Sequence, residues 1–333
     1  MKRLGLLIIF AGAILATVAT AEVSTDQPGA IIIFPKIVSD QSQDTIIQVS
    51  NAAGASVFAR CFYIDGSPDE ASGQPLWSVT NFEISLTRQQ PAIWVASEGL
   101  PTQPPDRPKE LYPGPIPPVS VGFLGELRCV VVNDNETPIS RNTLTGEATL
   151  IDRITHATRK YQGITVQGLA GNNGDNTLLL NDVEYSACPR VLLFNHFFDG
   201  APDPVLLNTT IESSLTFVPC SDDLEHTVPG SSTLQFNVAN EFEQRFSASL
   251  PLTCFADVKL SDISRTVFNF ALQGTMVGQT RIRPIVDADT GHGHGVVGIA
   301  EEFRDSRQTG AALNLHFIGG SLQPDVMVLP STF

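Results

Sequence analysis

The distribution of apolar residues along the chain is typical of β-strands. Short apolar, β-branched runs recur throughout and are separated by Gly, Pro, Asn and Asp, the residues that favour turns. Examples are AIIIFPKIV at 30–38, DTIIQVSN at 44–51, RCVVVND at 128–134 and STLQFNVAN at 232–240. Amphipathic segments long enough for a helix of a dozen residues do not occur. The pattern therefore predicts an all-β chain built as sandwiches or barrels.

The two halves of the chain repeat a series of short motifs in the same order. The series is IIIFP, IIQVSN, ARCFYI, GELRCVVV and GEATLI in the first half, and LTFVP, QFNVAN, LTCFAD, GQTRIRPIV and GIAEEF in the second. Spacing agrees best at the end, with 21 residues from Gly125 to Gly146 and 20 from Gly278 to Gly298. We therefore expect a duplicated module. Its predicted equivalent positions are Pro35 with Pro219, Asn51 with Asn240, and Cys61 with Cys254.

The stretch DTIIQVSNAAGASVFARCFYIDG at 44–66 resembles strands of immunoglobulin-like domains in exported bacterial proteins, where apolar residues alternate up to an Asn-containing turn. This resemblance implies two immunoglobulin-like antiparallel β-sandwiches joined by a loop-rich segment. The first sandwich would span 27–155 with a proline-rich insertion at 99–120, the joining segment 156–210, and the second sandwich 211–333. The chain is also similar in character to uncharacterised secreted proteins of Gram-negative bacteria, which implies no activity.

The first 21 residues have the layout of a secretory signal peptide. Lys2 and Arg3 form a basic start, an apolar run covers 4–18, and Ala21 is a small residue at the expected cleavage site. No later stretch approaches the roughly 20 apolar residues that a membrane-spanning helix needs. We therefore expect a secreted or periplasmic protein that does not span a membrane once the signal peptide is removed.

The net charge of the chain and the absence of common enzyme motifs limit the classes of function that it can have. The chain has 35 acidic and 20 basic residues and a net charge of −15, which becomes −17 without Lys2 and Arg3. Such a surface repels phosphate backbones, which excludes nucleic acid as a partner. Common hydrolase, redox and phosphate-binding motifs are absent, so no catalytic residue is predicted. These features favour an exported, non-catalytic structural, adhesive or partner-binding protein of the cell envelope, whose partner is a protein or a glycan.

The stretch VDADTGHGHG at 286–295 is the strongest candidate for a metal site. On an extended segment His292 and His294 project to the same face, and Asp287 and Asp289 offer the hard oxygen ligands that begin a calcium loop. Calcium or zinc would suit this set, and no organic cofactor is implied. The first interpretation remains a polar loop between two strands. The alternative is a metal-dependent extracellular enzyme or a calcium-binding protein. Asp289 also begins an Asp-Thr-Gly triad like that of aspartic proteases, but only one copy exists.

Five cysteines in an exported chain suggest two disulfides and one remaining thiol. The repeat favours Cys61 bonded to Cys129 and Cys220 bonded to Cys254, and leaves Cys188 over. Each bond would stabilise the fold by about 3–4 kcal/mol. Five reduced, buried thiols are the alternative.

Overall fold

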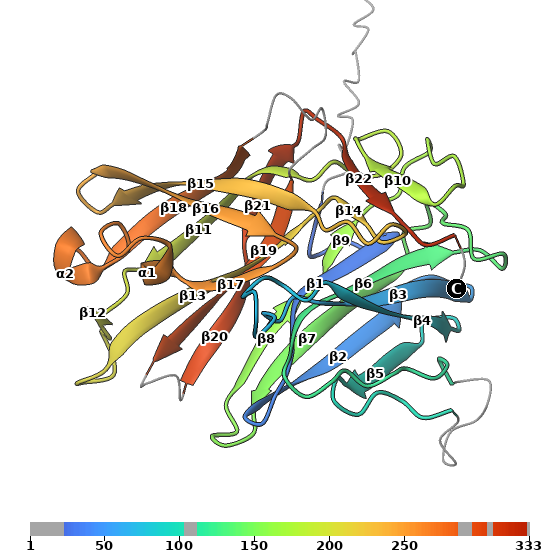
Figure 1. Cartoon of the computed structure of the whole chain (residues 1–333), viewed down its shortest axis with the longest axis horizontal. Helices are drawn as coiled ribbons and strands as arrows, with labels where there is room; N and C mark the ends of the chain where they lie inside the picture. Colours follow the sequence, from blue (N-terminus) through green and yellow to red (C-terminus); the bar gives the residue numbers. More distant parts are fainter. Residues whose placement is uncertain (1–22, 103–111, 286–294, 305–308, 332–333) are drawn as a thin grey trace, which may run out of the picture.

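The computed structural model describes residues 23–102, 112–285, 295–304 and 309–331, and is drawn in Figure 1. Within these residues the chain is all-β. Its strands form five sheets, and helix is limited there to the four-residue α1 (Leu260–Ile263) and α2 (Phe270–Gln273). The predicted all-β class is therefore confirmed.

Two sheets formed by the first half of the chain pack face to face. The five-stranded sheet has the order β4-β3-β6-β1-β9 and the four-stranded sheet the order β5-β2-β7-β8. The strands are β1 (Ile31–Ser39), β2 (Gln43–Asn51), β3 (Val57–Asp65), β4 (Ser78–Leu86), β5 (Pro91–Val95), β6 (Phe123–Val132), β7 (Leu144–Asp152), β8 (Thr158–Gln162) and β9 (Ile164–Val166). Because side chains alternate between the faces of a strand, the apolar positions of both sheets meet in one core. Phe34, Ile47, Trp94 and Leu150 are buried there.

The second half repeats this arrangement strand for strand. Its five-stranded sheet has the order β16-β15-β18-β11-β21, and the facing sheet contains β17, β13, β19 and β20 in that order, with the short β12 (Ala201–Pro202) also beside β13. The strands are β11 (Pro189–Phe197), β13 (Thr210–Pro219), β15 (Ser231–Asn240), β16 (Arg245–Thr253), β17 (Ala256–Lys259), β18 (Val277–Ile285), β19 (Val296–Arg304), β20 (Thr309–Asn314) and β21 (His316–Gly320). They take the places of β1 to β9 in order, around a second core that includes Phe217, Phe236 and Ile282.

The two halves share strand register as well as strand order. Cys129 of β6 lies opposite Cys61 of β3, and Ile282 of β18 lies opposite Phe236 of β15. With these positions matched, Ile32 and Phe34 of β1 correspond to Leu192 and Phe194 of β11, and each is buried in the core of its own half. The chain therefore does contain a duplicated module.

Glycines at equivalent positions explain part of the sequence repeat. A Cβ atom on Gly125 would lie 2.1 Å from the carbonyl oxygen of Ile64, and one on Gly278 would lie 3.2 Å from that of Ala239 and 2.8 Å from the ring of Phe198. Ile64 and Ala239 are themselves equivalent. Close approach of the neighbouring strand thus favours glycine in both copies.

The predicted repeat is right in its last two motifs and displaced by one strand in its first three. Gly125 matches Gly278, and Gly146 of β7 matches Gly298 of β19. Pro219, however, lies on β13, which corresponds to β2. The displacement arises because β11, the true counterpart of β1, falls inside the segment interpreted as a loop. The predicted equivalence of Pro35, Asn51 and Cys61 with Pro219, Asn240 and Cys254 is therefore wrong.

The immunoglobulin-like connectivity is also wrong. In an immunoglobulin sandwich the first strand pairs with the second. Here β1 pairs with β6 and β9, while β2 pairs with β5 and β7. The segment 156–210 is not a loop-rich joiner either, because β8 and β9 complete the first pair of sheets and β11 belongs to the second. β8 and β9 were missed because they are short and β8 is mostly polar. β11 has nine residues with the apolar run VLLF, and it was missed because the polar loops on either side of it dominated the interpretation of this segment.

A third core lies between the two halves. It is partly covered by a three-stranded sheet with the order β10-β22-β14, formed by β10 (Thr177–Leu180), β22 (Asp325–Val328) and β14 (Asp222–Asp223) (Figure 1). Leu178 and Met327 of this sheet pack in the same core as Ile33 and Val130, which lie on the outer face of the first five-stranded sheet. That outer face is therefore buried, whereas the equivalent face in the second half carries exposed side chains on alternate positions of β15 and β18.

Two disulfides are present, and one of them differs from the prediction. Cys61 and Cys129 are bonded across β3 and β6, as predicted. Cys220 is bonded to Cys188, so the predicted bond to Cys254 is wrong, and Cys254 is a buried free thiol. The error follows from the displaced repeat. Cys254 was expected to be bonded because it was matched with Cys61, and the structure shows that these two positions are not equivalent.

Candidate functional site

The predicted metal ligands Asp287, Asp289, His292 and His294 lie outside the described residues. The stretch 286–295 that contains them lies between β18 and β19, and these two described strands belong to facing sheets. Its last residue, Gly295, is described and is held firmly. The Gly295 amide donates to Asp325 Oδ1 at 2.9 Å, and its carbonyl accepts from the Cys220 amide at 2.8 Å.

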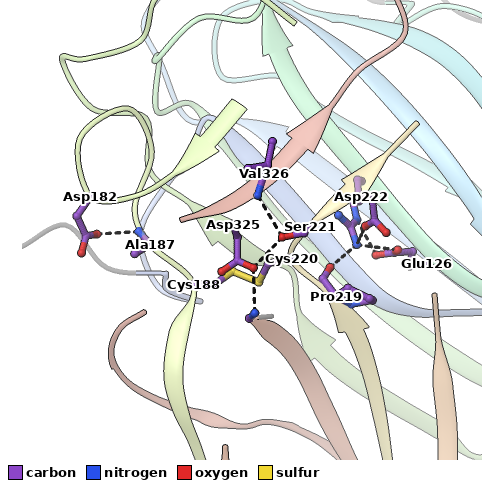
Figure 2. The surroundings of a disulfide bond; sticks show 12 residues. Glu126, Asp182, Ala187, Cys188, Pro219, Cys220, Ser221, Asp222, Asp325 and Val326 are labelled. Carbon is purple, nitrogen blue, oxygen red and sulfur yellow. Dashed lines mark hydrogen bonds and ion pairs between the residues drawn. A yellow bond between two sulfur atoms is a disulfide. The ribbon is translucent and has the colours of Figure 1, made fainter. Parts of the chain in front are cut away.

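Beside this anchor lies a group with the residue types of a metal site, which sequence reasoning missed. Ligand atoms of Cys188, Cys220 and Asp325 lie within 4.8 Å of one another, and all three residues are buried (Figure 2). Thiolate and carboxylate together suit zinc. In this structure, however, the two sulfurs form a disulfide and offer no thiolate. Asp325 Oδ1 also accepts a hydrogen bond from Ser221 Oγ at 2.8 Å. With the sulfurs bonded to each other and the carboxylate hydrogen-bonded, no cofactor is established at this group. Cys188, which the predicted pairing left over, is therefore not a free thiol.

A buried ion cluster joins the halves near this disulfide (Figure 2). Arg128 on β6 pairs with Glu126 at 2.8 Å and with Asp222 of β14 at 2.6 Å, and all three side chains are at most 1% exposed. Burial raises the pKa of both carboxyls, that of Asp222 to about 7, although Arg128 opposes the rise. Burial, together with these carboxylates, also raises the pKa of the nearby Cys254 thiol. The cluster is therefore a neutralised contact between the halves, and Cys254 is a poor nucleophile.

A second ion cluster crosses between the halves at another place. Lys36 of β1 lies 2.5 Å from Glu301 of β19 and 2.8 Å from Asp257 of β17, and Arg159 of β8 lies 2.7 Å from Glu301. Burial would raise the pKa of Glu301, but the two cations outweigh it and lower that pKa. Each charge is met by an opposite one, so this cluster too fixes the halves together.

The outer face of the second five-stranded sheet is an exposed basic surface, which we call the arginine face. It is defined by Arg245 on β16 and Arg281 and Arg283 on β18, with the exposed amides of Asn237 and Gln279 beside them. These residues line a shallow hollow of about 470 Å³. The sheet lies at the upper left of Figure 1. Sequence reasoning missed this face, although alternating polar residues in GQTRIRPI were a signal for it.

The arginine face is unusual for its charge. None of the five strands of this sheet contains Asp or Glu, although the whole chain has 35 acidic residues against 20 basic ones. Within the part of the chain that the structure describes, no ion pair involves Arg245, Arg281 or Arg283. Exposed guanidinium groups without a carboxylate partner can bind external anions in a planar, two-point geometry.

A wider hollow of about 700 Å³ lies where β4 meets the proline-rich insertion. It is lined by Phe58, Phe82, Leu100 and several prolines, together with polar residues of β4. The described lining gathers no set of catalytic or metal-ligating side chains.

Fold and sites together define an all-β, disulfide-bonded protein with a duplicated module. Among the described residues, no helix is long and apolar enough to cross a membrane. Neither the protein-family models nor the curated proteins contain a match. Among solved structures the chain is similar to red sea bream transglutaminase, with 10% identity over 94% of this chain and 32% of that one, at a TM-score of 0.14. The chain thus spans about a third of that protein, and so low a score supports no statement about shared fold or activity.

Proposed function

We propose that this chain is an exported, non-catalytic binding protein of the cell envelope, secreted or periplasmic, which holds an acidic partner on the arginine face. The signal-peptide pattern at 1–21 supports export, and two disulfides are compatible with an oxidising compartment. The two buried ion clusters, around Arg128 and around Glu301, pair charges of one half with charges of the other. These clusters hold the halves together, and binding takes place on the surface.

One observation carries the proposal: a sheet without acidic residues presents three arginines in a protein of net charge −15. On an acidic protein, a purely solvated surface would be expected to carry carboxylates as well. The strands that carry Arg245, Arg281 and Arg283 contain no carboxylate, and the acids nearest to them in the described sequence, Glu241 and Glu243, lie in the turn before β16. The strands therefore present a local positive potential, which attracts a negatively charged partner despite the net charge.

The test uses the mature chain and envelopes isolated from the cells that produce it. We expect the chain to sediment with the envelopes at low salt and to be released as salt is raised, because screening weakens exposed charge pairs. The variant Arg281→Glu/Arg283→Glu should remain in the supernatant. Equal sedimentation of this variant would refute the proposal. Retention of a chain lacking 1–21 in the cytoplasm tests the export step.

The second candidate is a metal-dependent extracellular enzyme or calcium-binding protein using Asp287, Asp289, His292 and His294. The observation that favours it is the adjacent anchor, where Gly295 is bound to a buried aspartate. Elemental analysis of the purified chain tests this candidate. Stoichiometric zinc or calcium that is lost in His292→Ala/His294→Ala would support it, and its absence would leave the segment as a connection between strands.

A further inference from the structure

The duplicated module allows the arginine face to be compared with the same face in the first half. Matched register makes Arg281 the counterpart of Arg128 and Gln279 the counterpart of Glu126. In the first half this arginine is neutralised, because Glu126 accepts two hydrogen bonds from it at 2.8 and 2.9 Å. In the second half a neutral amide stands in the place of that acid. Arg281 therefore keeps its full charge for an external acceptor.

Other positions of the arginine face are also more polar than their counterparts in the first half. Val130, which is buried in the core between the halves, corresponds to Arg283, and Phe62 corresponds to Asn237. An apolar contact surface in one copy is thus a polar, hydrogen-bonding surface in the other. Arginine planes and amide groups together recognise ligands that carry both anionic groups and hydroxyls.

The spacing of the charges suits an extended ligand. Arg281 and Arg283 are two residues apart on one strand, which separates their Cα atoms by about 7 Å. Arg245 lies two strands away, on β16, which adds about 10 Å across the sheet. A polymer with a negative charge on each repeating unit can meet several of these positions at once.

We infer that the ligand of the arginine face is an acidic polysaccharide, bound along the sheet by Arg245, Arg281 and Arg283. This inference rests on the function proposed above. A folded protein partner is disfavoured because the face offers no apolar pocket for an anchoring side chain. Single-stranded nucleic acid is disfavoured because Phe246, the one aromatic side chain lining the hollow, is half-buried, so that stacking platforms are lacking.

The experiment measures binding of the full mature chain to defined polymers by isothermal titration calorimetry. The probes are polygalacturonic acid, neutral dextran, poly-glutamate and a single-stranded oligonucleotide. We expect polygalacturonic acid to bind most tightly and neutral dextran not to bind. Arg281→Gln/Arg283→Gln should weaken that binding on the order of tenfold or more, since it removes two charge-assisted contacts.

A matched control removes the same charge elsewhere. Arg88 and Arg265 are exposed and lie outside the five strands, so Arg88→Gln/Arg265→Gln should bind as the wild type does. Both double variants change surface residues, and circular dichroism checks that they are folded. If poly-glutamate or the oligonucleotide binds as tightly as the polysaccharide with the same dependence on the two arginines, the polysaccharide inference fails and the proposed function stands. If no probe depends on the two arginines, both fail.

Discussion

The buried cluster around Arg128 gives the sharpest prediction about stability. One guanidinium group lies between two carboxylates, on Glu126 and Asp222, and none of the three side chains is more than 1% exposed. Arg128→Met keeps most of the volume and removes the cation. The variant therefore leaves two buried carboxylates without their shared partner.

The expected loss of stability is large because neither carboxylate can reach solvent. Breaking a buried ion pair from one side costs about 3–5 kcal/mol of unfolding free energy. Burial already raises the pKa of both carboxyls, and removing Arg128 raises them further. The folded variant then binds more protons than its unfolded chain, so it regains stability as pH falls from 8 to 5. The loss should therefore be greatest at pH 8.

Equilibrium unfolding in guanidinium chloride, followed by the fluorescence of Trp77 and the buried Trp94, measures this loss. The triple variant Glu126→Gln/Arg128→Met/Asp222→Asn has no buried charge left in the cluster, and should regain at least about 2 kcal/mol of the loss. A loss below about 1 kcal/mol at pH 8, or a triple variant no more stable than the single one, would show that the cluster is not sealed from water as described.

Three further predictions follow from the same structure. Thiol titration of the denatured, unreduced chain should find one thiol, and none in Cys254→Ala; three or five thiols would contradict the two disulfides. Gly125→Ala should lower the melting temperature more than Gly278→Ala, because its Cβ would meet the Ile64 carbonyl at 2.1 Å and overpacking costs about 1–3 kcal/mol; equal shifts would refute the register. Since the pKa of Asp222 is raised to about 7, folded protein holds an extra proton between about pH 4 and 7, and stability falls as pH rises through that range. In urea unfolding, Asp222→Asn should make stability depend less on pH in this range. An unchanged pH dependence would contradict the raised pKa of Asp222.

Much of the fold could be predicted from local pattern alone. Apolar alternation identified strands such as β2, β6 and β15, because each has one face in a core. The repeat could be detected where backbone geometry constrains the residue, as at Gly125 and Gly278. It was displaced where only apolar character was matched, since many strands share that character.

Contacts between distant segments could not be predicted in the same way. The Cys188–Cys220 bond depends on where the third core brings β11 and β13, and the neutralisation of Arg128 depends on Asp222, far along the chain. The arginine face was missed for a similar reason. Arg245 and Arg281 are brought together only when β16 and β18 pair with the two sides of β15.

Arginine modification tests the central claim most directly. Phenylglyoxal modifies exposed guanidinium groups, and mass spectrometry reports each site with and without polygalacturonic acid. The account predicts that the polymer protects Arg245, Arg281 and Arg283 and leaves Arg88 and Arg265 reactive. Equal protection of all five, or protection of the two control arginines alone, would contradict the assignment of the arginine face as the binding surface.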